Sequence, residues 1–129
     1  MAETENIVPR IENAPEFARK NRVLLLKHEP TQTEIDISLG ILPFEYEMVE
    51  RSHEVDVAGV FKLRLPTPED LIIMKAIAHR PKDLEDIRNI VEKQKKLDRR
   101  RIRQWVTDFA DALDNPAIWT EIRNLIEKA

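Results

Sequence analysis

Apolar and polar residues follow two different periods along this chain, and the change of period divides it into two parts. The clearest pattern of the first part is residues 34–39, where three apolar side chains alternate with Glu34, Asp36 and Ser38. A period of two is typical of a strand that buries one face. The apolar run of residues 22–28 precedes it across the turn-like sequence EPTQ. Together the two segments predict an antiparallel hairpin.

The rest of the first part predicts short elements. Residues 1–13 are polar and without a clear period, and are expected to form a loose or partly ordered entry to the domain. A short helix is predicted for residues 14–20, with Asn13 as its N-cap, and another for residues 43–51, presenting Phe44, Met48 and Val49 to the core. A second hairpin is predicted for residues 54–57 and 61–65, turning at Ala58-Gly59.

From Thr67 onward the pattern becomes helical. Thr67 suits the N-cap and Pro68 the first helical position, while Asp70 stands where a capping box places an acid. Pro81 is expected to interrupt this helix, because proline has no backbone N–H to donate. Asp83 can then cap the next helix.

Three further helices follow, at about residues 83–96, 100–113 and beyond Asn115-Pro116, each with an apolar stripe at helical spacing. The predicted fold class is therefore α+β: a small mixed or antiparallel sheet of two hairpins, followed by a bundle of about four helices. We expect one domain over residues 1–129, with the sheet in residues 1–65 and the helices in residues 66–129.

Composition excludes several classes of chemistry. The 129 residues carry a net charge of −3, include no cysteine and include only two glycines. Thiolate catalysis, zinc–cysteine sites and Gly-rich phosphate loops are therefore poor candidates. The first ten residues do not read as a signal peptide, and no apolar run is long enough to span a bilayer. A soluble protein of the reducing cytoplasm is expected.

Asp36 is a candidate metal ligand. It shares a strand face with Glu34, so that two carboxylates can approach one hard cation such as magnesium. The simpler interpretation is that both residues belong to the wet face of a strand, and spacing alone favours that interpretation.

Lys75 lies in an almost wholly apolar helix, where a charged side chain is unusual unless it is paired or reaches solvent. It can extend to solvent, pair with a carboxylate at the rim of the core, or reach into a cleft toward a phosphate. The first two interpretations are favoured by the sequence alone. The cationic and acidic cluster of residues 80–86 also has a structural explanation. Arg80 and Lys82 would follow one helix, and Asp83 and Asp86 would begin the next, each with the charge that suits the helix dipole.

Residues 93–103 form a strongly basic segment that is a candidate for contact with nucleic-acid phosphates. The segment crosses a helix junction, includes no aromatic residue and belongs to an acidic protein. A solvated surface is therefore the favoured interpretation.

Three segments resemble the nucleotidyltransferase superfamily in its minimal, AbiEii-like branch, which includes toxin components of toxin–antitoxin systems. Residues 22–45 (RVLLLKHEPTQTEIDISLGILPFE) resemble the strand that bears the third active-site carboxylate, with Asp36 in that position. The segment PTPEDLIIMK resembles the start of the helix after the core sheet. The run from Lys75 through Arg80, Lys82, Asp83 and Asp86 resembles the lysine–aspartate motif.

The resemblance implies catalytic roles for Asp36, Lys75 and Asp83, a magnesium ion bound by Asp36, and nucleotide-phosphate contacts from Lys75, Arg80 and Lys82. In the family, an earlier Gly-Ser motif and an Asp-x-Asp pair complete the site. This sequence includes neither. It therefore resembles the C-terminal portion of such an enzyme and is expected to be catalytically impaired by itself.

Several partners and functions follow from this interpretation. A nucleoside triphosphate is the implied ligand, and an uncovered sheet surface predicts self-association or pairing with a complementing chain. One alternative is a protein-interaction module using Trp105, Phe109 and Trp119, although the favoured interpretation of these aromatics is that they fill the core. The others are a nucleic-acid-associated regulator using residues 93–103 and a complete magnesium enzyme built differently around Asp36, Lys75 and Asp83.

Overall fold

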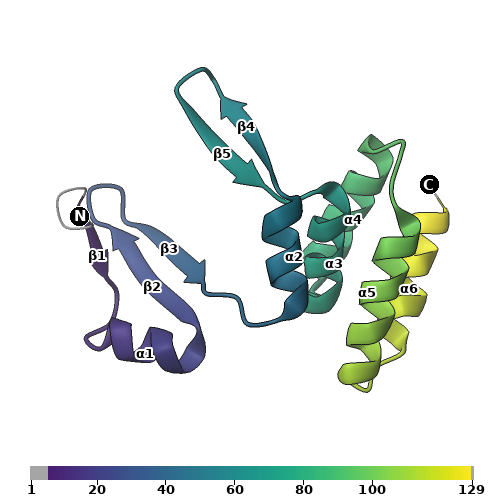
Figure 1. Ribbon diagram of the computed structural model, residues 1–129, viewed down its shortest axis with the longest axis horizontal. Helices are drawn as coiled ribbons and strands as arrows, with labels where there is room; N and C mark the ends of the chain where they lie inside the picture. Colours follow the sequence, from purple (N-terminus) through teal and green to yellow (C-terminus); the bar gives the residue numbers. More distant parts are fainter. Residues whose placement is uncertain (1–5, 129) are drawn as a thin grey trace. The chain divides into compact units, whose positions relative to one another are not determined.

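The computed structural model describes residues 6–128, which divide into two compact units between Tyr46 and Glu47 (Figure 1). That the whole chain forms one domain stays a prediction. The secondary structure is of the α+β class, with a three-stranded and a two-stranded antiparallel sheet and helices mostly in the C-terminal part, as predicted.

The first unit is a three-stranded sheet with one helix. Its elements are β1 (Ile7–Pro9), α1 (Ala14–Asn21), β2 (Val23–His28) and β3 (Thr33–Ser38). The strands are antiparallel in the order β1-β2-β3. The predicted hairpin is confirmed and Leu25 faces Asp36 across it.

Within the entry segment, residues 7–9 form the short strand β1, which pairs with β2 and was not predicted. A strand of three residues that includes a proline is too short to show a period in the sequence. Its conformation therefore follows from its pairing with β2. Residues 1–5 lie outside the described part of the chain. The helix predicted for residues 14–20 is confirmed as α1, although the Asn13 side chain makes no capping hydrogen bond.

Helix α2 (Pro43–Arg51) crosses the boundary between the units. Its start is held by Glu45, whose Oε2 accepts hydrogen bonds from the N–H groups of Ile41 and Leu42 at 2.7 and 3.0 Å. Phe44 is buried as predicted, whereas Val49 is 63% exposed. Val49 therefore does not belong to the core face of this helix.

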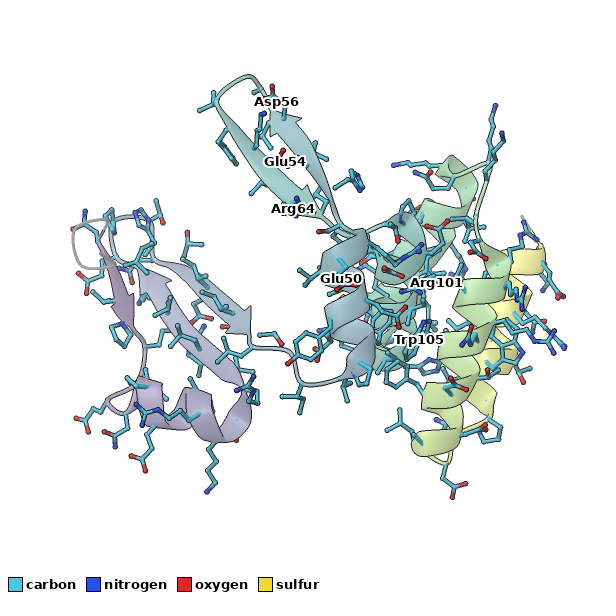
Figure 2. The ribbon with its side chains drawn as sticks, viewed as in Figure 1. Glu50, Glu54, Asp56, Arg64, Arg101 and Trp105 are labelled. Carbon is cyan, nitrogen blue, oxygen red and sulfur yellow. The ribbon has the colours of Figure 1, made fainter. Side chains whose placement is uncertain are left out.

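The second unit begins with the hairpin of β4 (His53–Val57) and β5 (Phe61–Leu65). Its register pairs Val55 with Leu63 on one face and Glu54 with Arg64 on the other. Figure 2 shows Glu54, Asp56 and Arg64 along this hairpin. One face is thus charged and the other apolar, and the apolar Phe61, Leu63 and Leu65 are exposed.

Four helices complete this unit: α3 (Pro68–Ala78), α4 (Pro81–Lys93), α5 (Arg99–Ala112) and α6 (Ala117–Glu127). Helix α3 packs against α4 and α5, and α6 packs against α4 and α5. This confirms the predicted bundle. Its core is formed by residues at helical spacing that are buried: Ile72, Ile73, Ala76, Ile87, Val91, Ile102, Val106, Ala110, Ile118, Ile122 and Ile126.

Two predicted details at the junction of α3 and α4 were wrong. Helix α4 begins at Pro81, so Lys82 lies in its first turn and not after the end of α3. Asp83 is the third residue of that helix, and its N-cap is Arg80. The reason is that proline is well suited to a first helical position, so that Pro81 starts a helix as well as ending one.

Candidate functional site

The junction of α3 and α4 brings together four of the five residues singled out from the sequence. His79 caps the C-terminal end of α3: its φ of 53° lies in the left-handed region and its N–H donates to the Lys75 carbonyl. Arg80 then takes an extended conformation before Pro81. This sharp reversal lets side chains of α4 approach those of α3.

Asp83 is the acid at the centre of this junction and is only 1% exposed. Its Oδ2 accepts hydrogen bonds from the Arg80 backbone N–H at 3.1 Å and from Arg80 Nε at 2.7 Å. The side-chain hydrogen bond from Arg80 is the main cause that lowers the pKa of Asp83, against the opposing effect of burial. The same bond raises the pKa of Arg80. Asp83 is therefore held as a carboxylate.

Lys75 extends from α3 toward the acids of α4. Its Nζ lies 2.7 Å from Asp86 Oδ2 and 3.9 Å from Asp83 Oδ1, and its side chain is 24% exposed. Of the two favoured interpretations, pairing with a carboxylate at the rim of the core is the one that the structure shows. The Lys75 ammonium group is therefore held by carboxylates and does not face a cleft unpaired.

Lys82 differs from its neighbours, since it is exposed and makes no ion pair with any residue in the described part of the chain. Arg80 keeps much of its side chain in solvent, with 71% exposed, although it is bound to Asp83. An anion approaching this junction would therefore meet Lys82 and the outer side of Arg80 first.

Asp36 belongs to the first unit. Arg10, directly after β1, binds it through Nη2 and also binds Glu34, with Nη1 3.0 Å from Glu34 Oε2. This confirms that Asp36 and Glu34 share one strand face. Both carboxylates share the single positive charge of the Arg10 guanidinium, a contact that the sequence pattern does not indicate.

The residues described do not fit a complete magnesium site. Within residues 6–128 no group of three or more His, Cys, Asp or Glu side chains is arranged to hold a metal ion. Asp36 and Glu34 supply two carboxylates, and Arg10 lies against both. Magnesium needs further oxygen ligands and near-octahedral geometry.

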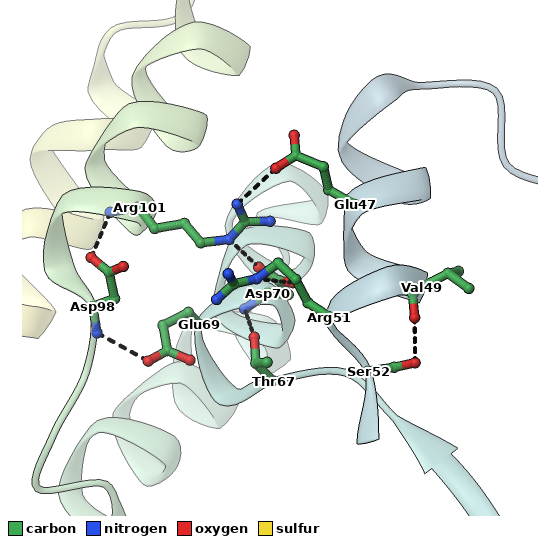
Figure 3. Close-up of polar contacts among 9 residues, drawn as sticks. All are labelled: Glu47, Val49, Arg51, Ser52, Thr67, Glu69, Asp70, Asp98 and Arg101. Atoms are coloured by element: carbon green, nitrogen blue, oxygen red, sulfur yellow. Dashed lines mark hydrogen bonds and ion pairs between the residues drawn. The ribbon is translucent and has the colours of Figure 1, made fainter. Parts of the chain in front are cut away.

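A second charged cluster, unforeseen from the sequence, lies between α2, α3 and α5 (Figure 3). Asp70 is fully buried, and its Oδ1 accepts a hydrogen bond of 2.7 Å from Arg101 Nε. Arg101 Nη1 also donates to Glu47 Oε1 at 3.1 Å, and Arg51 Nε lies 3.4 Å from Asp70 Oδ2. Burial disfavours the charged form of Arg101, but the hydrogen bonds to Asp70 and Glu47 outweigh it and raise its pKa.

This cluster corrects the capping role predicted for Asp70. The Asp70 N–H does donate to Thr67 Oγ1 at 3.2 Å, so Thr67 is the N-cap. The Asp70 carboxylate, however, turns inward to the arginines. The neighbouring Glu69 accepts a hydrogen bond from the Asp98 backbone at 3.0 Å, which ties the start of α5 to the start of α3. No sequence signal links Asp70 to a residue 31 positions later.

A comparison with protein families decides the affiliation of the chain. The family described as "Nucleotidyl transferase of unknown function (DUF2204)" matches residues 26–124. The chain belongs to this family. The match includes Asp36, the α3–α4 junction and the Asp70–Arg101 cluster, and it confirms the nucleotidyltransferase-like part of the resemblance.

Membership of the DUF2204 family leaves the role of each residue open, and the catalytic, nucleotide-binding and metal-binding assignments stay predictions. No curated protein matches the chain. Among the described residues, no helix is long and apolar enough to cross a membrane.

Proposed function

We propose that this chain acts as the C-terminal portion of a nucleotidyltransferase, one that transfers a nucleotidyl group from a nucleoside triphosphate and is inactive by itself. The family match over residues 26–124 carries the proposal. More specifically, we propose that the chain belongs to the AbiEii-like branch of these enzymes, a proposal that the lysine–aspartate run from Lys75 to Asp86 supports.

The absence of the other carboxylates is the reason for proposing inactivity. Asp36 would supply one metal ligand, while the sequence includes no Gly-Ser and no Asp-x-Asp to supply the rest. Magnesium stays a proposal that requires carboxylates from another polypeptide segment and release of Asp36 by Arg10. Such a metal would stabilise charge on the transferring phosphate.

The α3–α4 junction is the proposed phosphate-binding element. Lys82 is exposed and unpaired within the described part of the chain, so it is the best placed cation, and Arg80 adds the exposed part of its guanidinium. Lys75 pairs with Asp86 and lies near Asp83, and Asp83 also pairs with Arg80. We therefore assign Asp83 the role of positioning these cations.

A partner is part of the proposal. Phe61, Leu63 and Leu65 are 52%, 45% and 41% exposed on one face of the β4–β5 hairpin. An apolar face of this kind favours burial against another surface. A second copy, or a complementing chain of the toxin–antitoxin kind, would supply it.

A protein-interaction module is the second candidate function. Trp105 and Phe109 are partly exposed on α5, with their ring centroids 6.0 Å apart. If these rings form a contact surface, added partner should shift their fluorescence to shorter wavelength and protect it from a soluble quencher.

The test of the leading proposal is an amide NMR titration with ATP and magnesium. Saturable shifts are expected at residues 75–82 and near Asp36. Lys82→Gln should remove those at the junction and Asp36→Ala those that depend on magnesium. Glu54→Ala, an exposed strand carboxylate outside the proposed site, is the matched control.

Flat spectra up to millimolar nucleotide would overturn nucleotide binding by this chain. Shifts that persist unchanged in Lys82→Gln would overturn the assignment to the junction. Turnover of the triphosphate by the isolated chain would overturn the proposed inactivity.

A further inference from the structure

We propose that the pocket between α5 and α6 binds single-stranded nucleic acid, with arginines on the phosphates and Trp119 stacked on a base. The two helices lie side by side in the second unit (Figure 1). The pocket between them has a volume of about 370 Å³ and is lined by Arg99, Arg100, Arg103, Trp119, Arg123, Ile126 and Glu127. This inference does not rest on the proposed nucleotidyl transfer.

The arginines come together because of helical spacing. Arg99 and Arg103 are four residues apart on α5, and Trp119 and Arg123 are four residues apart on α6. Residues four apart share one face of a helix. Since α5 and α6 pack against each other, the two sets line the same pocket.

Most of this positive charge is not neutralised within the protein. Arg99, Arg100 and Arg103 make no ion pair with any residue from 6 to 128. Arg123 Nε lies 4.0 Å from Glu127 Oε2, a contact between two half-exposed side chains that is worth little in water. Four arginines therefore face one glutamate in a pocket that has room for an anion.

The lysines before α5 extend the positive charge along the surface. Lys93, Lys95 and Lys96 are exposed and make no ion pair in the described part of the chain. A run of cations that continues beyond the pocket suits a polyanion more than a single free nucleotide.

Trp119 supplies the aromatic that residues 93–103 lack. It is partly exposed and lines the pocket from α6. Proteins that bind single strands combine a basic groove with aromatic side chains on which bases stack. A double helix hides its base faces and an acidic peptide has none, so this combination favours an unpaired strand.

The experiment measures binding of a fluorescein-labelled single-stranded RNA dodecamer to the whole chain by anisotropy, at several salt concentrations. Replacing both Arg100 and Arg103 with Gln should weaken binding about tenfold or more. It should also flatten the slope of log K against log salt by about 0.7 for each arginine–phosphate pair that the substitutions remove. Arg19→Gln is the matched control and should change neither value, because Arg19 is an exposed arginine on α1 that forms no ion pair with any of residues 6–128.

The stacking role needs its own variants. Trp119→Leu should weaken binding by roughly 5- to 150-fold while leaving the salt slope unchanged, and Trp119→Phe should retain most of the affinity. Far-ultraviolet circular dichroism of each variant checks that α6 is intact. If Trp119→Leu unfolds the helix, quenching of Trp119 emission by the RNA in a Trp105→Phe background tests the same contact.

Four outcomes would overturn the inference. These are equal affinity for a duplex of the same length, equal affinity for poly-glutamate, equal affinity for a mononucleotide, and binding that the arginine substitutions leave unchanged. The second would indicate an acidic protein partner and the third a free nucleotide.

Discussion

At the scale of single residues, two buried aspartates of the second unit show how the same side chain serves different purposes. Asp70 joins helices that are distant in sequence through Arg101, whereas Asp83 closes a local turn with Arg80 three residues earlier. Both carboxylates lie almost entirely out of solvent. A buried charge is tolerated when it is paired and hydrogen bonded, so each aspartate depends on its arginine.

Asp70→Asn should destabilise the second unit by about 3–5 kcal/mol, because it leaves Arg101 largely buried without its main counter-charge. Urea unfolding of the variant and the wild-type chain measures the difference. Asp111→Asn, an exposed acid of α5 without an ion pair in the described residues, is the control and should stay within about 0.5 kcal/mol of wild type. A similarly small loss for Asp70→Asn would contradict the role of the cluster.

The pKa of Asp83 predicts a dependence of stability on acid. Its folded pKa lies below the ordinary value of 3.8, so its contribution is complete above that value and is lost as the pH falls through the folded pKa. The urea midpoint of wild type should therefore fall more steeply on acidification below pH 4 than that of Asp83→Asn. Parallel curves for the two proteins would show that Asp83 is not held as a carboxylate by folding.

At the scale of elements, the β4–β5 hairpin combines an awkward turn with an exposed apolar face. Ala58 has a φ of 54° and Gly59 a φ of 69°, both in the left-handed region. Glycine tolerates this region, while alanine does not favour it. The Gly59 N–H donates to Asp56 Oδ1 at 3.0 Å, which helps to hold the turn closed. The sequence predicts this hairpin with Ala58-Gly59 as an acceptable, though not ideal, tight turn.

Ala58→Asn should stabilise the hairpin by roughly 0.5–1 kcal/mol, because asparagine adopts positive φ more readily and Asn-Gly suits tight hairpin turns. The expected readout is hydrogen exchange of the β4 and β5 amides that is about two- to fivefold slower, if exchange reports local opening. Ala58→Val is the opposite control. It should destabilise the hairpin and speed the exchange of these amides, because a β-branched residue is strained at positive φ. Slower exchange in the valine variant would contradict the turn assignment.

At the scale of the whole molecule, the exposed face of Phe61, Leu63 and Leu65 bears on association. A lone two-stranded hairpin is marginal in water, so a stable β4–β5 pair with an apolar face favours a covering surface. The proposal of self-association or of a complementing chain rests on this face. The helical bundle, by contrast, buries its own apolar stripes.

Leu63→Lys should weaken self-association about tenfold, because it places a charge in the surface to be buried. Sedimentation velocity over a hundredfold range of concentration measures it. Lys62→Gln, on the charged face of the same strand, should leave association unchanged. A wild-type chain that stays monomeric throughout that range, without added partner, would contradict self-association. Pairing with a different chain would then be the proposal to test.

The sequence by itself determined the local features of this protein. Alternation, an apolar run and turn residues located both hairpins. Helical spacing, together with Thr67, Pro81 and Pro116 at helix boundaries, located the helices to within a few residues. These features rest on interactions between residues near one another in the chain, which a pattern can record. For Lys75 the apolar helix left two favoured interpretations, extension to solvent and pairing with an acid, and the structure shows the pairing.

Only the tertiary structure decided which distant charges meet. Arg10 on Asp36 and Arg101 on Asp70 each join residues more than 25 positions apart, and β1 exists through its pairing with β2. The α5–α6 pocket likewise needs Trp119 to lie beside arginines from another helix. Such contacts follow from how whole elements pack, and side chains that meet in this way leave no period in the sequence.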